Sequence, residues 1–373
     1  MRAAHRLPRN ANQLDLETVL RRTAETAADR DAHPTFPEQP FRDLAATGTL
    51  AIPVPEPPSG EGRRASFAEE WRVLRAVARA DGSVGRILDG HFNAVERVAV
   101  AAPEPLRSRE LEAVAAGELL LGVWGADPIP EEGTPARLSD DGRTISGVKT
   151  FCSGSTGVQR TLVLVRGADG APGPPYLAYV DLSGGIEVDT TWFKGAGMRS
   201  SESHRVVFDG ARVLAVLGGP GELLREPYFA RDAIRTAVTW AGICDCAVDA
   251  ALTILAAKST GREPDDLVSL AAGRMLTAQG TIDRWLEYAA EQADADPTAS
   301  LAPFATQLRE AVASSCREVL DEAARAVGSL PFAVSGPLDR ARRDLELFLL
   351  QHRLEPAVVR RGRKAILDSG ASS

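Results

Sequence analysis

The stretch GPLDRARRDLELFLLQHRLEPAVVRRGRKAI, residues 336–366, carries the strongest structural pattern in the chain. Gly336 and Pro337 indicate a turn that leads into the first turn of a helix. Apolar side chains then recur at spacings of three and four, which places them on one helical face: Leu338, Ala341, Leu345 and Phe348. The next position on that face is His352. A helix of residues 338–352 that ends in a partly buried, hydrogen-bonded histidine is the simplest explanation of this pattern.

A second histidine lies on an apolar face early in the chain. Spacings of four, three, four and three connect Val84, Leu88, His91, Val95 and Val98. A core histidine with satisfied hydrogen bonds would explain His91 without any function. Two histidines on two apolar faces could instead converge on one cavity, and the sequence leaves both interpretations open.

The composition of the chain limits which kinds of protein it can be. The 373 residues are 44% hydrophobic and 25% charged, which is ordinary for a globular chain of two or three domains. The formal net charge of −8 gives no reason to expect nucleic acid or an anionic membrane as a partner. No uncharged apolar run is long enough to span a bilayer, and the first residues lack a signal-type apolar core, so a cytoplasmic protein is expected. Four scattered cysteines and five separated histidines indicate neither a disulfide framework nor a metal site.

The order of predicted elements divides the chain into three domains. Residues 1–118 read as an N-terminal helical domain. Residues 119–221 read as an antiparallel β domain, with strands predicted at 119–125, 145–154, 160–165, 176–181 and 203–213. Residues 222–373 read as an antiparallel four-helix bundle, with helices predicted at 231–258, 267–292, 301–327 and 338–352.

Several local motifs resemble the acyl-CoA dehydrogenase superfamily. They are DGRTISGVKTFCS at 141–153, GAGMRSS at 195–201, FDGARV at 208–213, and the Arg343-Asp344 pair. The resemblance covers essentially the whole chain. It implies an α+β, mostly α fold, with an N-terminal helical domain, a central antiparallel β-barrel and a C-terminal four-helix bundle.

One departure points to a branch of that superfamily. The dehydrogenases carry a catalytic glutamate eight positions after the aspartate of the RD pair, and this chain has His352 there. With DGSVGRILDGHF at 81–92, the chain is similar to the flavin-dependent monooxygenase branch, typified by dibenzothiophene monooxygenase. The resemblance implies a reduced-flavin-dependent monooxygenase that uses a C4a-(hydro)peroxyflavin on a small organic substrate. His352 and His91 would then flank the oxygen adduct as catalytic residues.

The same resemblance implies a flavin site. Phe151 would lie beside the flavin ring and Ser153 near its N5 atom, and the full predicted set is Trp124, Phe151, Cys152, Ser153, Arg199 and Ser200. FMN is favoured over FAD, because KSTGR at 258–262 lacks the phenylalanine and GSLP at 328–331 lacks the glycines with which the dehydrogenases hold the adenine half. No nicotinamide fingerprint is present, so a separate flavin reductase is expected as a partner. Homodimers or homotetramers are usual in the family.

Two alternatives stay open. The first is an FAD-dependent acyl-CoA dehydrogenase or oxidase with an atypical base, for which Glu346 or Glu355 is the candidate. The second is a flavin-free assembly component without enzymatic activity. His204 occupies a turn where the family usually has a small residue. It could project into the pocket or face solvent, and we expect it to face solvent.

Overall fold

The computed structural model describes residues 15–58, 65–170, 173–351 and 353–371. Its first part is helical, as the sequence predicts. The elements are α1 (Leu16–Glu25), α2 (Ala27–Ala32), α3 (Glu38–Ala46), the 3-10 turn η1 (Thr49–Ala51), α4 (Phe67–Ala80), α5 (Gly82–Ala101) and α6 (Leu106–Ala115). The hydroxyl of Ser66 caps α4 by accepting from the backbone of Glu69, and the carboxylate of Asp81 caps α5.

A seven-stranded sheet follows the helices. Its strands are β1 (Leu121–Trp124), β2 (Arg137–Leu138), β3 (Thr144–Cys152), β4 (Arg160–Val165), β5 (Tyr176–Asp181), β6 (Ile186–Asp189) and β7 (His204–Leu217). The strand order is β1-β4-β5-β7-β3-β2, and β6 pairs with β7. All five predicted strands are present, whereas β2 and β6 are too short to have produced an alternating pattern.

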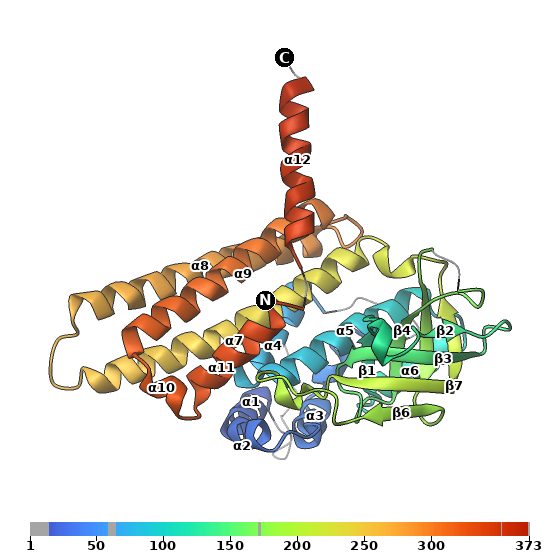
Figure 1. The fold of residues 1–373 in the computed structure, drawn as a ribbon, viewed down its shortest axis with the longest axis horizontal. Helices are drawn as coiled ribbons and strands as arrows, with labels where there is room; N and C mark the ends of the chain where they lie inside the picture. Colours follow the sequence, from blue (N-terminus) through green and yellow to red (C-terminus); the bar gives the residue numbers. More distant parts are fainter. Residues whose placement is uncertain (1–14, 59–64, 171–172, 352, 372–373) are drawn as a thin grey trace, which may run out of the picture.

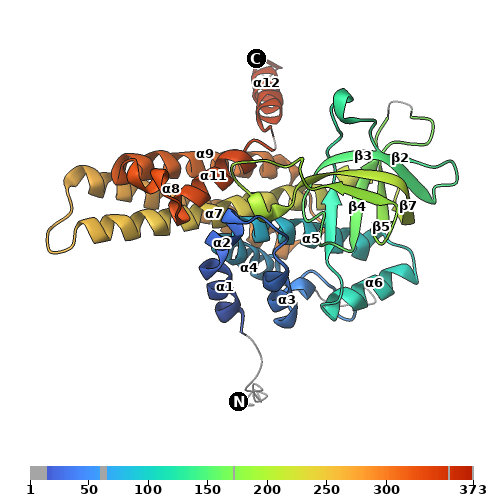
Figure 2. The ribbon, with the colours of Figure 1, turned by 60° about the horizontal axis from the view of Figure 1, so that its bottom comes forward.

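The predicted antiparallel β-barrel does not close, and its sheet is mixed. β1 pairs with β4 in parallel, with Leu121 opposite Arg160, and the ladder ends at β1 and β2 without a full pairing between them. A parallel pair becomes possible because β2 and β3 lie between β1 and β4 in the chain and return it to the same end of the sheet. Helix α5 packs against β1, which is largely buried. The result is a mixed, open sheet that helices border at one edge (Figure 2).

The last part of the chain is again helical. It contains α7 (Tyr228–Lys258), α8 (Asp266–Ala295), α9 (Ala302–Val327), the short α10 (Leu330–Ala333), α11 (Pro337–Phe348) and α12 (Glu355–Ala371). Helices α7, α8 and α9 extend side by side along the long axis, and α12 projects away from them (Figure 1). α7 packs against α9, α11 and α5, and α4 from the N-terminal part packs against both α7 and α8. A separate four-helix bundle therefore stays a prediction.

Helix α11 is shorter than predicted. It ends at Phe348, so the regular spacing that placed His352 on the apolar face does not continue to that position. His352 itself lies outside the described residues. The four apolar positions of the predicted face are buried, as expected: Leu338, Ala341, Leu345 and Phe348.

The RD pair fixes α11 to the rest of the molecule. The buried carboxylate of Asp344 accepts a hydrogen bond from the backbone N–H of Met198, and Arg343 forms an ion pair of 2.6 Å with Asp31 of α2. A Cβ added at Gly197 would lie 2.0 Å from the carbonyl oxygen of Arg343. Only glycine therefore permits this close approach of the loop to α11.

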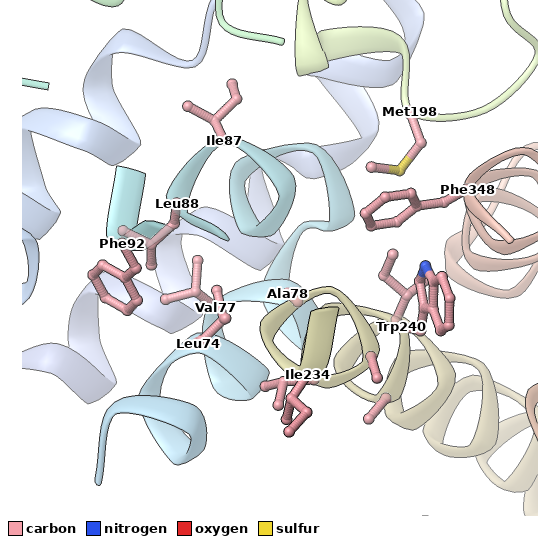
Figure 3. Packing of buried hydrophobic residues seen from close by; sticks show 14 of the residues in the cluster. Leu74, Val77, Ala78, Ile87, Leu88, Phe92, Met198, Ile234, Trp240 and Phe348 are labelled. Atoms are coloured by element: carbon pink, nitrogen blue, oxygen red, sulfur yellow. The ribbon is translucent and has the colours of Figure 1, made fainter. Parts of the chain in front are cut away.

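One core unites the three parts. Trp240 of α7 contacts Phe348 of α11 edge to face, with ring centroids 6.1 Å apart, and Met198 from the loop before β7 lies beside Phe348 (Figure 3). α7 is long and apolar enough by composition to cross a membrane, but 56% of its most apolar window is buried inside the fold, as in the core helix of a globular protein. The shared core thus holds the sheet and the helices in fixed positions relative to each other.

Candidate functional site

A cavity of about 570 Å³ lies between one end of the sheet and the helices α5, α7, α9 and α11. Its volume falls within the usual range for small-molecule sites, roughly 300–1,000 Å³. Most of its wall is apolar. Residues from the sheet and its loops that line it include Val123, Gly125, Ala126, Phe151, Ser153, Leu162, Leu164, Met198, Ser201 and Ser203. Residues from the helices include Arg86, Asn93, Arg97, Phe229, Asp232, Ala233, Thr236, Arg309, Leu347 and Phe348.

Phe151 has an unusual conformation at the sheet end of this cavity. Its φ of 52° lies in the left-handed region, which a bulky aromatic residue rarely adopts. The side chain remains 46% exposed although Phe151 lies between buried residues at the end of β3, and its ring meets Trp192 edge to face, with ring centroids 4.9 Å apart. The local strain turns a flat apolar ring out of β3 and towards the cavity.

Three serine hydroxyls form a chain on the same wall. Ser153 Oγ lies 2.9 Å from Ser203 Oγ, which lies 2.7 Å from Ser201 Oγ. All three residues line the cavity. Each hydroxyl can donate one hydrogen bond and accept others, so the chain can present either a donor or an acceptor to a ligand.

Trp124 supports this wall from behind. Its side chain is completely buried, and its Nε1–H donates to the carbonyl oxygen of Ser153 at 2.9 Å. It does not line the cavity, so its role in the structure is to position Ser153. A direct contact of Trp124 with a flavin is not supported by this placement.

The buried Lys149 fixes the turn after β1. Its ammonium group forms an ion pair with Asp127 at 2.7 Å and donates to the carbonyl oxygen of Gly125 at 3.1 Å. Burial lowers the pKa of Lys149, although the neighbouring carboxylate opposes that shift. Gly125 and Ala126 are therefore held at the cavity wall.

The helical side of the cavity carries charge. Arg86 pairs with the completely buried Asp89 at 3.0 Å, and Asp89 also accepts from Asn93. Arg97 pairs with Asp232 at 2.6 Å. Burial raises the pKa of Asp232 to about 6, despite the opposing pull of its arginine neighbours. Polar groups thus converge on one end of a mainly apolar cavity.

His91 does not line this cavity. Its Nδ1 accepts a hydrogen bond from the backbone of Leu121 and its Nε2 donates to the carbonyl oxygen of Leu50, both at 3.0 Å. Burial lowers the pKa of His91 to about 4, so the ring is neutral. At about 100° per residue, His91 lies roughly 140° around α5 from Arg86, which does line the cavity. The predicted catalytic role of His91 is therefore not favoured by the geometry, which gives it the structural role of joining α5 to β1 and η1.

The other predicted flavin residues are dispersed. Cys152 is completely buried, and burial raises the pKa of its thiol. The hydroxyl of Ser200 donates to the carbonyl oxygen of Arg30, and Arg199 lines a different cavity, of about 1,410 Å³. Of the six residues, the structure brings only Phe151 and Ser153 to the apolar cavity.

The expectation that His204 faces solvent is wrong. The residue is only 5% exposed, and its Nε2 lies 3.2 Å from a carboxylate oxygen of Glu202. It lines the same large cavity as Arg199. The reason is the left-handed backbone at Glu202, which turns the chain so that the following residues enter β7 facing inwards.

The polar residues of the helical wall were missed by the sequence reasoning. Arg86, Asn93 and Arg97 are separated by seven and four residues and share one face of α5. A polar face within a helix that is otherwise rich in small and apolar residues was the available signal. Arg309 of α9 gave no such signal, because its helix carries other charges at regular intervals.

The sheet end of the cavity fits a flavin ring. Phe151 supplies a flat apolar surface, the serine chain supplies hydroxyl donors, and Gly125 places backbone at the cavity wall. No lining residue offers a reactive thiol or metal ligand set among the described parts of the chain. The hydroxyls and the apolar surface of this wall therefore agree with a bound redox cofactor, which the protein would orient.

Comparisons with known proteins agree with this geometry. Residues 16–118 match the N-terminal domain of the acyl-CoA dehydrogenases. The dibenzothiophene monooxygenase of Rhodococcus erythropolis is 28% identical over 234 residues, which are 58% of this chain and 54% of that protein. A probable FMNH2-dependent monooxygenase, SfnC of Pseudomonas putida, is 26% identical over 55% of this chain and 49% of its own length. The chain thus spans about half the length of these curated relatives.

A solved structure extends the similarity to the whole fold. FMN-bound TdsC from Paenibacillus sp. A11-2 superposes with a TM-score of 0.78, at 20% identity, over 92% of this chain and 94% of that one. At this identity the superposition establishes the fold. The resemblance to the monooxygenase branch that the motifs predicted is confirmed by these comparisons together.

Proposed function

We propose that this protein is a reduced-flavin-dependent monooxygenase that acts on a small organic substrate. The proposal follows from its membership of the acyl-CoA dehydrogenase superfamily, since its relatives lie in the monooxygenase branch. The observation that carries the proposal is the single cavity shared by Phe151 and Ser153 on one side and a polar helical wall on the other. Such a cavity can hold a flavin ring at the sheet and a substrate between the ring and the helices.

The flavin supplies the oxygen chemistry, and the chain supplies binding, orientation and exclusion of water. Phe151 would pack against the ring, and its strained backbone fixes the position of that surface. Ser153 would offer its hydroxyl to the flavin, with Ser203 bonded to it to donate or accept in turn. A hydroxyl that is already part of a chain keeps its direction and can pass a proton along the chain.

Apolar side chains exclude water from the space above the ring. Leu162, Leu164, Phe229 and Phe348 line this part of the wall. Water exclusion strengthens each electrostatic interaction in the cavity and protects a reactive oxygen species from hydrolysis. The charged helical wall then remains the main source of orientation for a polar group of the substrate.

The cofactor proposed is FMN in its reduced form. Support comes from the name of the Pseudomonas relative, from the FMN in the TdsC structure, and from the missing adenine-side residues at 258–262 and 328–331. A separate reductase would supply the reduced flavin. We further propose a cytoplasmic homodimer or homotetramer in which the helices of residues 222–373 form a four-helix bundle, with domain limits at 118 and 221.

Neither glutamate proposed as the base of the dehydrogenase alternative lines the cavity. Glu346 is exposed, pairs with Arg342 at 2.7 Å, and does not line the cavity. Glu355 begins α12 and is likewise exposed and away from the cavity. Abstraction of a proton from an acyl group needs a carboxylate directed at the reacting carbon.

Activity is tested by mixing the anaerobic complex of protein and reduced FMN with oxygen. With no substrate present, a monooxygenase is expected to delay both the appearance of oxidised flavin and the release of hydrogen peroxide relative to free reduced FMN, with the same final yield of peroxide. Reoxidation at the rate of free flavin would refute the proposal. Rapid reduction of bound flavin by an acyl thioester would favour the dehydrogenase alternative.

A further inference from the structure

Arg309 is a partly buried cation at the cavity, and two of its nitrogens have no hydrogen-bond partner among the described residues. It reaches the cavity from α9, and its Nε and Nη2 atoms are buried without a hydrogen-bond partner. Among the described residues it forms no ion pair. Its guanidinium carbon lies 5.3 Å from the centre of the Trp240 ring, which is its one specific aromatic contact. The Arg309 side chain that carries these two unpartnered nitrogens lines the cavity.

The surrounding charges do not neutralise Arg309. Around the helical wall the described residues place five arginines against four carboxylates: Arg86, Arg97, Arg231, Arg235 and Arg309 against Glu70, Asp89, Glu96 and Asp232. Each carboxylate in this set already pairs with one of the first four arginines. One positive charge is left over, and it belongs to the arginine that has no ion pair.

Burial makes this excess charge costly. It lowers the pKa of Arg309 to about 10, although Asp89 acts in the opposite direction. A buried charge is normally paired, because desolvation is otherwise not compensated. The face of Trp240 offers only about 2 kcal/mol to a desolvated cation. An oxyanion, by contrast, could accept two parallel N–H bonds from the guanidinium fork.

Apolar side chains flank Arg309 on one side. Phe348 contacts both Trp240 and the guanidinium of Arg86, whose carbon lies 5.6 Å above the Phe348 ring. Figure 3 shows Met198, Phe348 and Trp240 grouped on this side of the core. Ala233 and Leu347 complete the wall. A ligand that fits must therefore combine one anionic group with a compact apolar body.

We propose that the substrate is a small apolar, preferably aromatic, molecule with one carboxylate or sulfonate group, and that Arg309 binds this group. This inference rests on the proposed function, because the bound anion is a substrate only if the protein is a monooxygenase. Recognition of the anion is a property of the cavity itself. It can be measured without flavin, reductant or oxygen, so its failure and the failure of the proposed function are distinguishable.

The test is calorimetric titration of the full-length protein with matched probes. Benzoate, benzenesulfonate and naphthalene-2-carboxylate are compared with neutral benzamide and 2-naphthamide. We expect at least one anion to bind tenfold or more tightly than its neutral counterpart. Arg309→Met should remove that preference, Arg309→Lys should retain part of it, and Arg317→Met, an exposed control on α9, should behave as wild type.

Three results would overturn the inference. They are the absence of binding by every anion, equal binding of anions and amides, and a preference that survives Arg309→Met in a folded variant. A further experiment distinguishes a substrate anion from the flavin phosphate as the ligand of Arg309. If Arg309→Met weakens binding of reduced FMN but not of reduced riboflavin, Arg309 binds the flavin phosphate and the inference is wrong.

Discussion

Replacement of Asp344 by asparagine should make the protein less sensitive to rising pH. Asp344 is 4% exposed and accepts from the backbone N–H of Met198, which an asparagine carbonyl oxygen can also do. Burial raises the pKa of this carboxyl from 3.8 to about 7, and the nearby charge of Asp81 adds to the shift. The folded state therefore holds the proton more tightly than the unfolded state.

Proton linkage gives the sign and the size of the Asp344 contribution to the free energy of unfolding. A carboxyl with a raised pKa in the folded state contributes stability that is complete below pH 3.8 and is lost as the pH rises towards 7. With these two values, the wild type should lose about 2.6 kcal/mol of unfolding free energy between pH 5 and pH 8 through this group. Asp344→Asn removes that loss, so the variant should gain on the wild type as the pH rises.

Urea unfolding of both proteins at pH 5, 6, 7 and 8 measures the difference directly. The difference between the two unfolding free energies should grow by roughly 2–3 kcal/mol across this range. Asp209→Asn, at an exposed position, should follow the wild-type curve. A constant difference, or a variant that weakens relative to wild type as the pH rises, would refute the reasoning.

Three further substitutions test the site and its supports. Ser153→Ala should weaken reduced FMN binding about tenfold in a titration, because one donor is lost, while Ser203 retains another hydroxyl partner and the urea midpoint stays unchanged. Gly197→Ala should destabilise the protein by about 1–3 kcal/mol or more in urea, since the added Cβ meets the carbonyl oxygen of Arg343. His91→Phe should cost roughly 2–4 kcal/mol, because two buried backbone groups lose their partners, yet keep reduced FMN affinity within threefold. A loss of flavin binding in a stable His91→Phe variant would restore its catalytic role.

Much of the fold could be predicted because its signals are local. The apolar spacing of α5 and α11, the cap at Ser66 and the alternating strands each depend on residues close in the chain. The parallel pairing of β1 with β4 depends on how the intervening chain returns, which no local pattern records. The end of α11 at Phe348 was missed because an apolar spacing continues in the sequence after the helix has stopped.

The site was predictable on its sheet side and not on its helical side. Phe151 and Ser153 lie in a motif whose spacing fixes which side chains leave the strand, and both line the cavity. Whether Trp124 at the end of β1 and Cys152 at the end of β3 face the cavity or the core depends on how the two strands twist and pair, which appears only in three dimensions. His91 shows the same limit, because an apolar face contains core histidines as readily as catalytic ones. Arg309 became visible only through the absence of a partner in the fold.

The most direct test of the account is an anaerobic titration of the purified protein with reduced FMN, compared with oxidised FMN and with FAD. The account predicts that reduced FMN binds most tightly. It also predicts that Ala126→Trp, which fills the sheet end of the cavity, abolishes binding, whereas Ala168→Trp at an exposed turn leaves it intact. Absence of flavin binding, tight co-purifying FAD, or full binding by the Ala126→Trp variant would contradict it.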